Sequence, residues 1–138
     1  MIIIDSSVAF KWFSQEDEGD IDKALEILDL HLQKKEIITV PDLIIYELAN
    51  VWATKSNLPL KRSKVFLKDF QNSQFVIEQI SFELINKAMT FSKKYKVSVY
   101  DTIYAVLAKE KKCLLITADE KFVEKINLPF VKLLQEYK

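Results

Sequence analysis

The chain has 138 residues, of which 49% are hydrophobic and 29% charged, a composition typical of one globular domain spanning residues 1–138. Twenty basic residues balance twenty acidic ones, so the sequence lacks the basic excess of a general nucleic-acid binder. A single glycine excludes glycine-rich phosphate loops, and a single histidine excludes two-histidine nucleases and zinc sites of the H-E-x-x-H type.

Short apolar runs and helical patterns alternate from the start of the chain. Residues 2–4 predict a buried strand, and residues 5–7 (Asp-Ser-Ser) offer caps for a short helix over residues 8–13. A polar stretch follows over residues 15–20. Apolar residues at helical spacing then predict a helix over about 21–34, with His31 facing solvent on its polar side.

The alternation continues in the middle of the chain. Residues 37–40 are rich in β-branched side chains and predict a second strand. Pro41 suits the first turn of the helix expected over residues 42–55. Asn57-Leu58-Pro59 then interrupts the pattern, and a further helix is expected over about 60–71.

The second half of the chain repeats the same arrangement. Ser81 and Ser98 precede two helical patterns and are expected to cap them. The expected strands are 75–80, 113–117 and 130–134, and the expected helices are 81–91, 98–112 and 119–125. Because the strands are mostly uniformly apolar and alternate with helices, we expect an α/β fold. It would be an α/β/α sandwich around a short parallel sheet, whose ligands gather at the carboxyl ends of the strands.

Cys113 is the only cysteine, so no disulfide can form within the chain, which favours a reducing compartment. No apolar run approaches the ~20 residues of a membrane span. Asp5 also interrupts the first apolar run too early for a secretory signal. We therefore expect a cytoplasmic protein.

Two acids follow expected strands directly. Asp5 comes after the strand 2–4, and Asp119 lies two residues past the strand that ends at Thr117, whose hydroxyl is close by in sequence. Each acid could simply cap the helix that follows, because aspartate is among the favoured N-cap residues. Alternatively, each could present its carboxylate to a ligand at the edge of the sheet.

A third acid, Glu47, interrupts the apolar stripe of its helix. Leu43, Glu47 and Val51 share one i, i+4 row that should face the core. An unpaired buried carboxylate costs several kcal/mol, roughly speaking, so Glu47 requires a partner. A salt bridge to a lysine, or access to water at the edge of the stripe, would also satisfy it.

The fourth acid, Asp101, lies in the first turn of the helix expected after Ser98. Ser98-x-x-Asp101 resembles a capping box with aspartate in place of glutamate, which is one explanation of the acid. Tyr104, Ala105 and Ala108 continue the row of Asp101, and the two small residues would let the helix pack closely against the sheet. Asp101 would then stand at the lip of the core.

Parallel topology brings all four acids to one edge of the sheet. Four carboxylates in one cleft repel each other and titrate as a coupled set, and a divalent cation removes that repulsion. Ligands that are all oxygens, without histidine or thiolate, favour Mg²⁺ or Mn²⁺.

Four segments of the chain, taken in order, resemble the motifs of the PIN-domain ribonucleases, and most closely those of the VapC-type toxins of toxin–antitoxin pairs. They are MIIIDSSV, PDLIIYELANV, VYDTIYAVLA and LLITADEKF. The resemblance covers essentially the whole chain, and its acidic quartet matches Asp5, Glu47, Asp101 and Asp119. Ser7 matches the small polar residue after the first acid, and Thr117 the hydroxyl before the last.

The resemblance implies an endoribonuclease that depends on Mg²⁺ or Mn²⁺ and inhibits translation by cleaving RNA. Asp5 and Asp101 would bind the principal ion, while Asp119 and Glu47 would hold a second ion or its waters. Ser7 and Thr117 would support the acids by hydrogen bonds. The family also implies a homodimer and an antitoxin that occupies the cleft. A housekeeping RNA-maturation nuclease, or a PIN-like module that only binds RNA or protein, remains an alternative.

Two other classes share parts of this pattern. Receiver domains place adjacent acids after the first strand, where this chain has serines at positions 6 and 7. Phosphatases of the haloacid-dehalogenase type require D-x-D there, and Ser7 stands at the second aspartate. Both classes are therefore disfavoured.

Other residues are open to two interpretations. Trp12, Trp52 and Phe66 could belong to the core or to a protein interface. Basic clusters could contact RNA phosphates, although solvated helix faces balanced by acids elsewhere explain them better. These clusters are Lys61, Arg62 and Lys64, and Lys93, Lys94 and Lys96.

Overall fold

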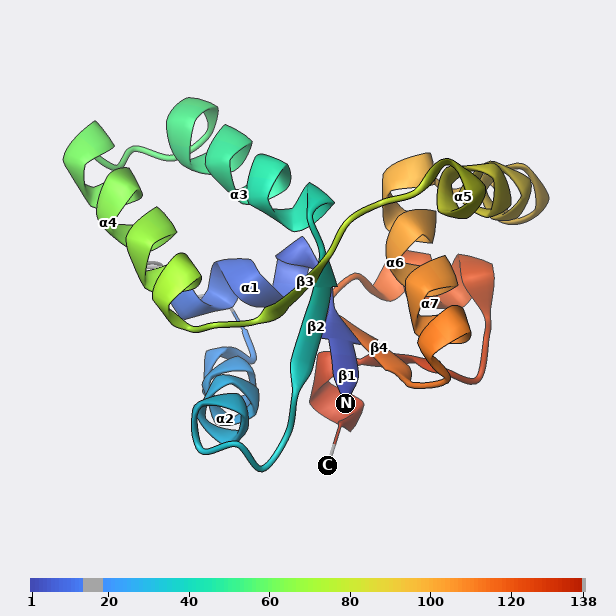
Figure 1. Ribbon diagram of the computed structural model, residues 1–138, viewed down its shortest axis with the longest axis horizontal. Helices are drawn as coiled ribbons and strands as arrows, with labels where there is room; N and C mark the ends of the chain where they lie inside the picture. The colour runs from blue at the N-terminus through green and yellow to red at the C-terminus, as the bar shows by residue number, and fades with distance from the viewer. Residues whose placement is uncertain (14–18, 138) are drawn as a thin grey trace.

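The computed structural model describes residues 1–13 and 19–137 (Figure 1). Most of the polar stretch expected over residues 15–20 lies outside these residues. The elements are β1 (Ile2–Ile4), α1 (Ser6–Phe13), α2 (Ile21–Leu32), β2 (Ile38–Pro41), α3 (Leu43–Thr54), α4 (Leu60–Asn72), β3 (Val76–Glu78), α5 (Phe82–Tyr95), α6 (Val99–Lys111), β4 (Leu114–Thr117), α7 (Glu120–Ile126), β5 (Val131–Leu133) and a 3₁₀ turn, η1 (Leu134–Glu136).

The five strands form one parallel sheet in the order β3-β2-β1-β4-β5. β1 lies at the centre, where Ile2 is aligned with Ile38 of β2 and Ile4 with Ile116 of β4. Both β1 and β2 are buried along their whole length, as expected of strands that are covered on both faces. The expected α/β class is confirmed.

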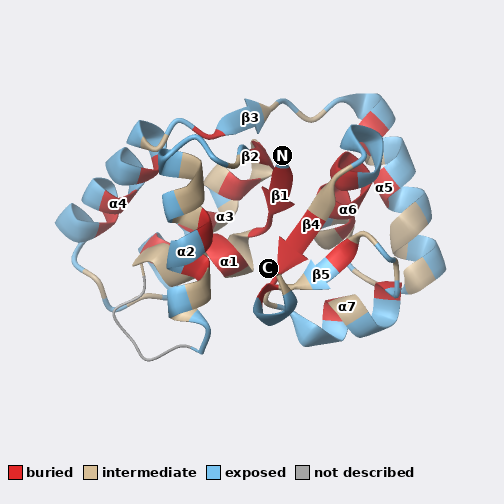
Figure 2. Ribbon diagram, turned by 90° about the horizontal axis from the view of Figure 1, so that it is seen from below, coloured by how far each residue is buried: buried red, intermediate tan, exposed pale blue. Residues whose placement is uncertain are grey.

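Helices cover both faces of the sheet. In Figure 1, α1 to α4 lie on one side of the strands and α5 to α7 on the other, and Figure 2 shows the buried residues concentrated in β1, β4 and the helices against them. α6 packs across β1, β2 and β4, and α5 packs against α6 from outside. Within the described residues, no helix is both long and apolar enough to cross a membrane.

The serine caps form as expected. The side chain of Ser81 accepts a hydrogen bond from the Leu84 N–H at 3.1 Å and begins α5. The side chain of Ser98 accepts one from the Asp101 N–H at 3.1 Å and begins α6. Both helices therefore start at the residues that the sequence indicates.

Pro41 is one point at which the expectation was wrong. It ends β2, aligned with Glu78 of β3, and α3 begins two residues later. Proline lacks an N–H, so a strand tolerates it at a position where no ladder hydrogen bond is donated. β3 is also shorter than expected, and it lies at one edge of the sheet with Val76 and Ile77 exposed.

His31 does not face solvent as expected; it is half-buried and bonded on both ring nitrogens. Nδ1 accepts a hydrogen bond from the Ile38 N–H at 3.1 Å, and Nε2 lies 2.9 Å from the Ser73 carbonyl oxygen. The ring also packs against Phe75, with 4.8 Å between centroids. The polar side of α2 on which His31 lies is thus covered by β2 and the end of α4. The histidine has a structural role.

The aromatic residues of uncertain role belong to the core. Trp52 and Phe66 are buried, and both contact Phe13. Trp12 stacks on Phe75 at 5.2 Å and donates its indole N–H to the Ala24 carbonyl oxygen at 2.7 Å. These contacts join α1 to the helices around it.

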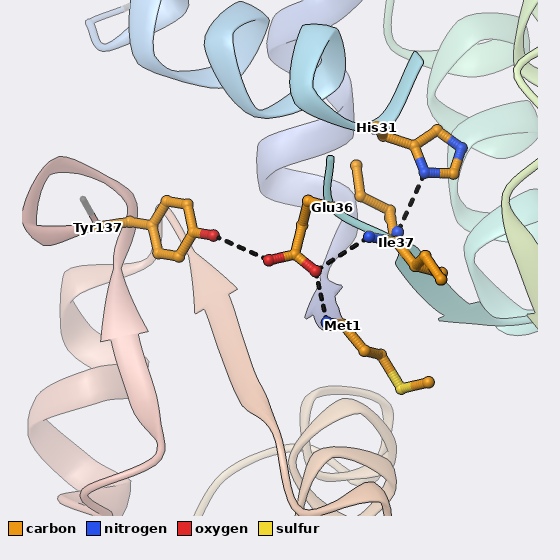
Figure 3. A network of polar contacts seen from close by, with 6 residues as sticks. Met1, His31, Glu36, Ile37 and Tyr137 are labelled. Atoms are coloured by element: carbon orange, nitrogen blue, oxygen red, sulfur yellow. Dashed lines mark hydrogen bonds and ion pairs between the residues drawn. The ribbon is translucent and has the colours of Figure 1, made fainter. Parts of the chain in front are cut away.

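At the amino edge of the sheet, Glu36 holds three parts of the chain together (Figure 3). Its carboxylate forms an ion pair with the amino group of Met1 and accepts the Ile37 N–H at 2.9 Å. The Tyr137 hydroxyl donates to its second oxygen at 3.4 Å. Burial opposes its ionisation, but these donors outweigh burial and lower the pKa of Glu36 below its usual value.

Candidate active site

Asp5 stands at the opposite, carboxyl edge of the sheet, between two hydroxyl groups. Because Ile4 of β1 is aligned with Ile116 of β4, the next residue pair is Asp5 and Thr117. The Thr117 hydroxyl donates to Oδ2 of Asp5 at 2.5 Å, and the Ser7 hydroxyl donates to Oδ1 at 2.5 Å. Only 7% of Asp5 is exposed, so the two hydroxyls fix a carboxylate that is almost fully buried.

Asp5 also caps α1. Its Oδ1 accepts hydrogen bonds from the Ser7 N–H at 3.1 Å and the Val8 N–H at 3.4 Å. The expectation that this acid caps the helix after it is therefore confirmed. It leaves unexplained why the cap is an aspartate buried beside other acids, because a serine would cap without a buried charge.

Asp119 is joined to Asp5 through the same two hydroxyls. The Ser7 hydroxyl accepts the Ala118 N–H at 2.9 Å, and the Thr117 hydroxyl accepts the Asp119 N–H at 3.1 Å. The Asp119 side chain is exposed, and its Oδ1 caps α7 by accepting the Phe122 N–H at 3.1 Å. Ser7 and Thr117 thus tie the turn after β4 to the end of β1.

Glu47 finds its partner in a phenol. The Tyr104 hydroxyl on α6 donates to Oε1 of Glu47 on α3 at 2.5 Å, and Glu47 also interacts with the hydroxyl of Ser6. The ion pairs of the described residues involve other acids, so the lysine partner considered for Glu47 is replaced by these neutral donors. Those acids are Glu26, Glu36, Glu78, Glu83 and Glu110.

Asp101 occupies the first turn of α6 as expected, half-buried at the lip of the core. Tyr104, Ala105 and Ala108, which share its row, are all buried where α6 packs on the sheet. The packing of these three residues holds α6 against the sheet. It thereby fixes the position of Asp101 at the carboxyl edge.

The electrostatics couple the four acids. Burial raises the pKa of Asp5 to about 6, against the hydrogen bonds of Ser7 and Thr117, and the charge of Asp101 raises it further. Burial and the charge of Asp101 raise the pKa of Glu47, while the Tyr104 hydrogen bond opposes this shift.

Asp101 lies at the centre of this group. Burial raises its pKa, the interaction with Ser98 opposes the shift, and the charge of Asp119 adds to it. Asp5 and Glu47 therefore each feel the charge of Asp101, and Asp101 feels that of Asp119, as expected of acids at one edge of a parallel sheet. Burial and the neighbouring carboxylates also raise the pKa of the Tyr104 phenol, which remains a hydrogen-bond donor to Glu47.

The donor chemistry suits a hard divalent cation, because every candidate ligand is a carboxylate, and burial together with neighbouring charge raises the pKa values of three of them. Within residues 1–13 and 19–137, however, no three acidic, histidine or cysteine side chains stand together in an arrangement ready to hold an ion. The oxygens of Asp5 are bonded to hydroxyls instead. A cation would have to compete with these hydroxyls for the carboxylates.

The two basic clusters lie on or next to the outer helices α4 and α5. Lys61, Arg62 and Lys64 are exposed on α4, where the Arg62 guanidinium lies 5.4 Å from the centroid of the Phe66 ring. In Figure 1, α4 forms the outer end of the α3–α4 arm.

The second cluster lies at the end of α5. Lys93, Lys94 and Lys96 are exposed there, with the Lys94 ammonium over the Tyr95 ring at 5.2 Å. Neither cluster forms part of the acidic site.

Sequence reasoning did not identify Tyr104 and Ser6 as polar parts of the site. The sequence pattern marks Tyr104 only as a member of a packing row, yet a phenol on a buried row needs a hydrogen-bond partner. Glu47, an acid on another buried row, has the complementary need. The two unmatched polar groups together were the signal that could have paired them.

Comparison with known proteins places this architecture. The sequence matches the PIN domain family over residues 2–127. No curated protein sequence matches the chain. Among solved structures, a toxin–antitoxin complex from Klebsiella pneumoniae is similar at 19% identity and a TM-score of 0.73, covering 99% of this chain and 100% of the other.

Two further structures show the same fold. Mycobacterium tuberculosis VapC20, described as a toxin that cleaves the sarcin–ricin loop, has 12% identity and a TM-score of 0.70, covering 90% of this chain and 94% of its own. VapBC2 from Rickettsia felis, bound to a DNA fragment from its promoter, has 18% identity and a TM-score of 0.66, covering 96% and 97%. Since the family match spans nearly the whole chain, the protein belongs to the PIN domain family.

Proposed function

We propose that this protein is a metal-dependent endoribonuclease and the toxin of a toxin–antitoxin pair. The observation that carries the proposal is the group of four acids, Asp5, Glu47, Asp101 and Asp119, in a PIN domain. Three of them have raised pKa values through burial and mutual repulsion. Charges held in such unfavourable surroundings are typical of functional sites.

Mg²⁺ or Mn²⁺ would be held by Asp5 and Asp101, with Asp119 close by. When bound, the cation neutralises the acids, binds a phosphate oxygen and lowers the pKa of water. Ser7 and Thr117 would orient Asp5 for the cation, because each donates a hydrogen bond to one of its two carboxylate oxygens. Glu47, held by Tyr104, orients the attacking water, because no histidine stands in the site to do so.

RNA is the substrate we propose, on the strength of the VapC-like fold. The phosphate backbone of RNA must approach a chain of zero net charge. Lys61, Arg62 and Lys64 on α4 offer one exposed patch of phosphate contacts, which would make binding fall as salt rises. Their separation from the acids means that they would hold RNA beside the cleavage site rather than in it.

We also propose a cytoplasmic homodimer that is inhibited by an antitoxin. Several of the similar structures are toxin–antitoxin complexes, including that of Klebsiella pneumoniae. Several large apolar side chains of the described residues are more than half exposed, as a partner surface requires. The most exposed are Phe82, Tyr46, Leu60, Tyr100 and Met89.

The proposal is tested by incubating total cellular RNA with the wild-type chain and with Asp5→Asn, each with and without Mg²⁺, and mapping the cleavage sites. We expect the wild type to cleave RNA at few sites and only with Mg²⁺. The cleavage rate of Asp5→Asn should be lower by about a thousandfold or more, because the variant lacks one charged ligand of the cation. Glu36→Gln, which changes an acid at the opposite edge, is the matched control and should cleave like the wild type.

Cleavage by Asp5→Asn at the wild-type rate would overturn the assignment of the site. No cleavage by the wild type with Mg²⁺ would favour a PIN-like binding module. Cleavage confined to the ends of precursor RNAs would favour RNA maturation over a toxin.

A further inference from the structure

The hydrogen bond between Tyr104 and Glu47 links the buried core of the molecule to the candidate site. Tyr104 is 1% exposed on α6, which packs across the three central strands. Its hydroxyl lies 2.5 Å from Oε1 of Glu47 on α3, a helix on the other side of the sheet from α6 (Figure 1). The phenol therefore reaches past the carboxyl edge of the sheet.

The two side chains differ in freedom. A buried tyrosine ring is fixed by packing on all sides, whereas a glutamate has three rotatable bonds and Glu47 is only half-buried. A hydrogen bond from a fixed donor selects one orientation of a mobile acceptor. The carboxylate of Glu47 is thus aimed by a group that itself cannot turn.

We propose that Tyr104 is a positioning residue of the active site, which acts by fixing the carboxylate of Glu47. The inference rests on the proposed nuclease function for its effect on catalysis. Tyr104 does not contact RNA or cation in this scheme, because its side chain is buried behind Glu47. Its hydroxyl, rather than its ring, is the part that matters for catalysis.

The first test is Tyr104→Phe, which keeps the ring and removes the hydroxyl. We expect kcat for a short RNA substrate to fall about 10- to 100-fold, as for the loss of one hydrogen bond to a charged group, with KM within about twofold. Tyr137→Phe is the matched control, since it removes a tyrosine hydroxyl that donates to Glu36 at the opposite edge. Its kcat should equal that of the wild type.

A double-mutant cycle separates positioning from packing. In a Glu47→Ala background there is no carboxylate to orient, so Tyr104→Phe should cause no further loss of kcat. An equal loss in both backgrounds would show that the phenol supports the core and would overturn the proposal.

A measurement without RNA or metal makes the inference independent of the assay. In protein with ¹³C-labelled glutamate, the carboxyl resonance of Glu47 should shift in Tyr104→Phe and stay in place in Tyr137→Phe. An unchanged resonance would overturn the role of Tyr104 whatever the activity. If the wild type cleaves no RNA, the proposed function fails, and this spectrum alone decides whether Tyr104 holds Glu47.

Discussion

The two edges of the sheet hold acids in opposite circumstances. At the amino edge, Glu36 accepts from the Met1 amino group and the Ile37 N–H, and its pKa is lowered. At the carboxyl edge, Asp5 is almost fully buried and has only neutral donors; burial, helped by the charge of Asp101, raises its pKa to about 6. The same functional group therefore stabilises the fold at one edge and opposes it at the other.

This contrast indicates which edge carries function. Raising the pKa of Asp5 from 3.8 to about 6 corresponds to roughly 3 kcal/mol of lost stability at neutral pH. Folding alone gives no reason for such an arrangement, because a neutral residue could cap α1. A bound cation would offset the repulsion, and this is why we place the active site there.

The largest effect on stability is expected from Asp5→Asn in metal-free protein. Asparagine keeps an acceptor for Ser7 and removes the buried charge, so the free energy of unfolding at pH 8 should rise by about 1–3 kcal/mol. The pKa of Asp5 is raised in the folded state. The stability that protonated Asp5 contributes to the wild type is therefore fully present below about pH 4 and is lost as pH rises through about 6. Urea unfolding between pH 4 and pH 8 measures both quantities.

The pH profile also supplies the control for this prediction. The gain from Asp5→Asn should largely disappear at pH 4, because wild-type Asp5 is then protonated in the folded state and pH 4 lies close to its ordinary pKa of 3.8. A gain of equal size at pH 4 and pH 8 would contradict the account, because it would not come from the charge.

Glu36→Gln should change stability in the other direction. It removes the charge that pairs with the Met1 amino group, and the free energy of unfolding at pH 7 should fall by about 1 kcal/mol. Because the pKa of Glu36 is lowered in the folded state, its stabilisation is present above the pKa of the unfolded state and is lost as pH falls through the lowered value. Thermal unfolding at pH 7 and pH 3 checks this, and a variant more stable than wild type at pH 7 would remove the contrast between the edges.

The smallest effect is expected from Asp101→Asn without metal. Asp101 is only half-buried, so removing its repulsion of Asp5 and Glu47 should raise the free energy of unfolding by no more than about 0.5 kcal/mol. The melting temperature of the metal-free variant is the measurement. A fall of several degrees would instead favour Asp101 as a structural member of the Ser98 cap.

The sequence was enough for the fold and for the placement of the acids. Uniformly apolar strands alternating with helices predict a parallel sheet, and such a sheet forces Asp5 and Asp119 to one edge because both follow strands. Asp101 could be placed because the small residues on its row, Ala105 and Ala108, require close packing of α6. These inferences depend on local patterns and on a topology with few alternatives.

Contacts between distant elements could not be predicted in the same way. The bond of Glu47 to Tyr104 depends on how α3 and α6 approach each other across the sheet edge. His31 was misplaced because β2 and the end of α4 cover a face of α2 that its own sequence marks as polar. Ser73, at the end of α4, lies 42 residues from His31, and Tyr104 lies 57 residues from Glu47.

The most direct test of the acidic site is the binding of Mn²⁺ to the full chain, measured by isothermal titration calorimetry at pH 7. We expect the wild type and Glu36→Gln to bind with the same affinity, because Glu36 lies at the far edge of the sheet. Asp101→Asn should bind at least about tenfold more weakly, since it loses one charged ligand. Equal affinity of Asp101→Asn and wild type, or weaker binding by Glu36→Gln alone, would contradict a cation site at the carboxyl edge.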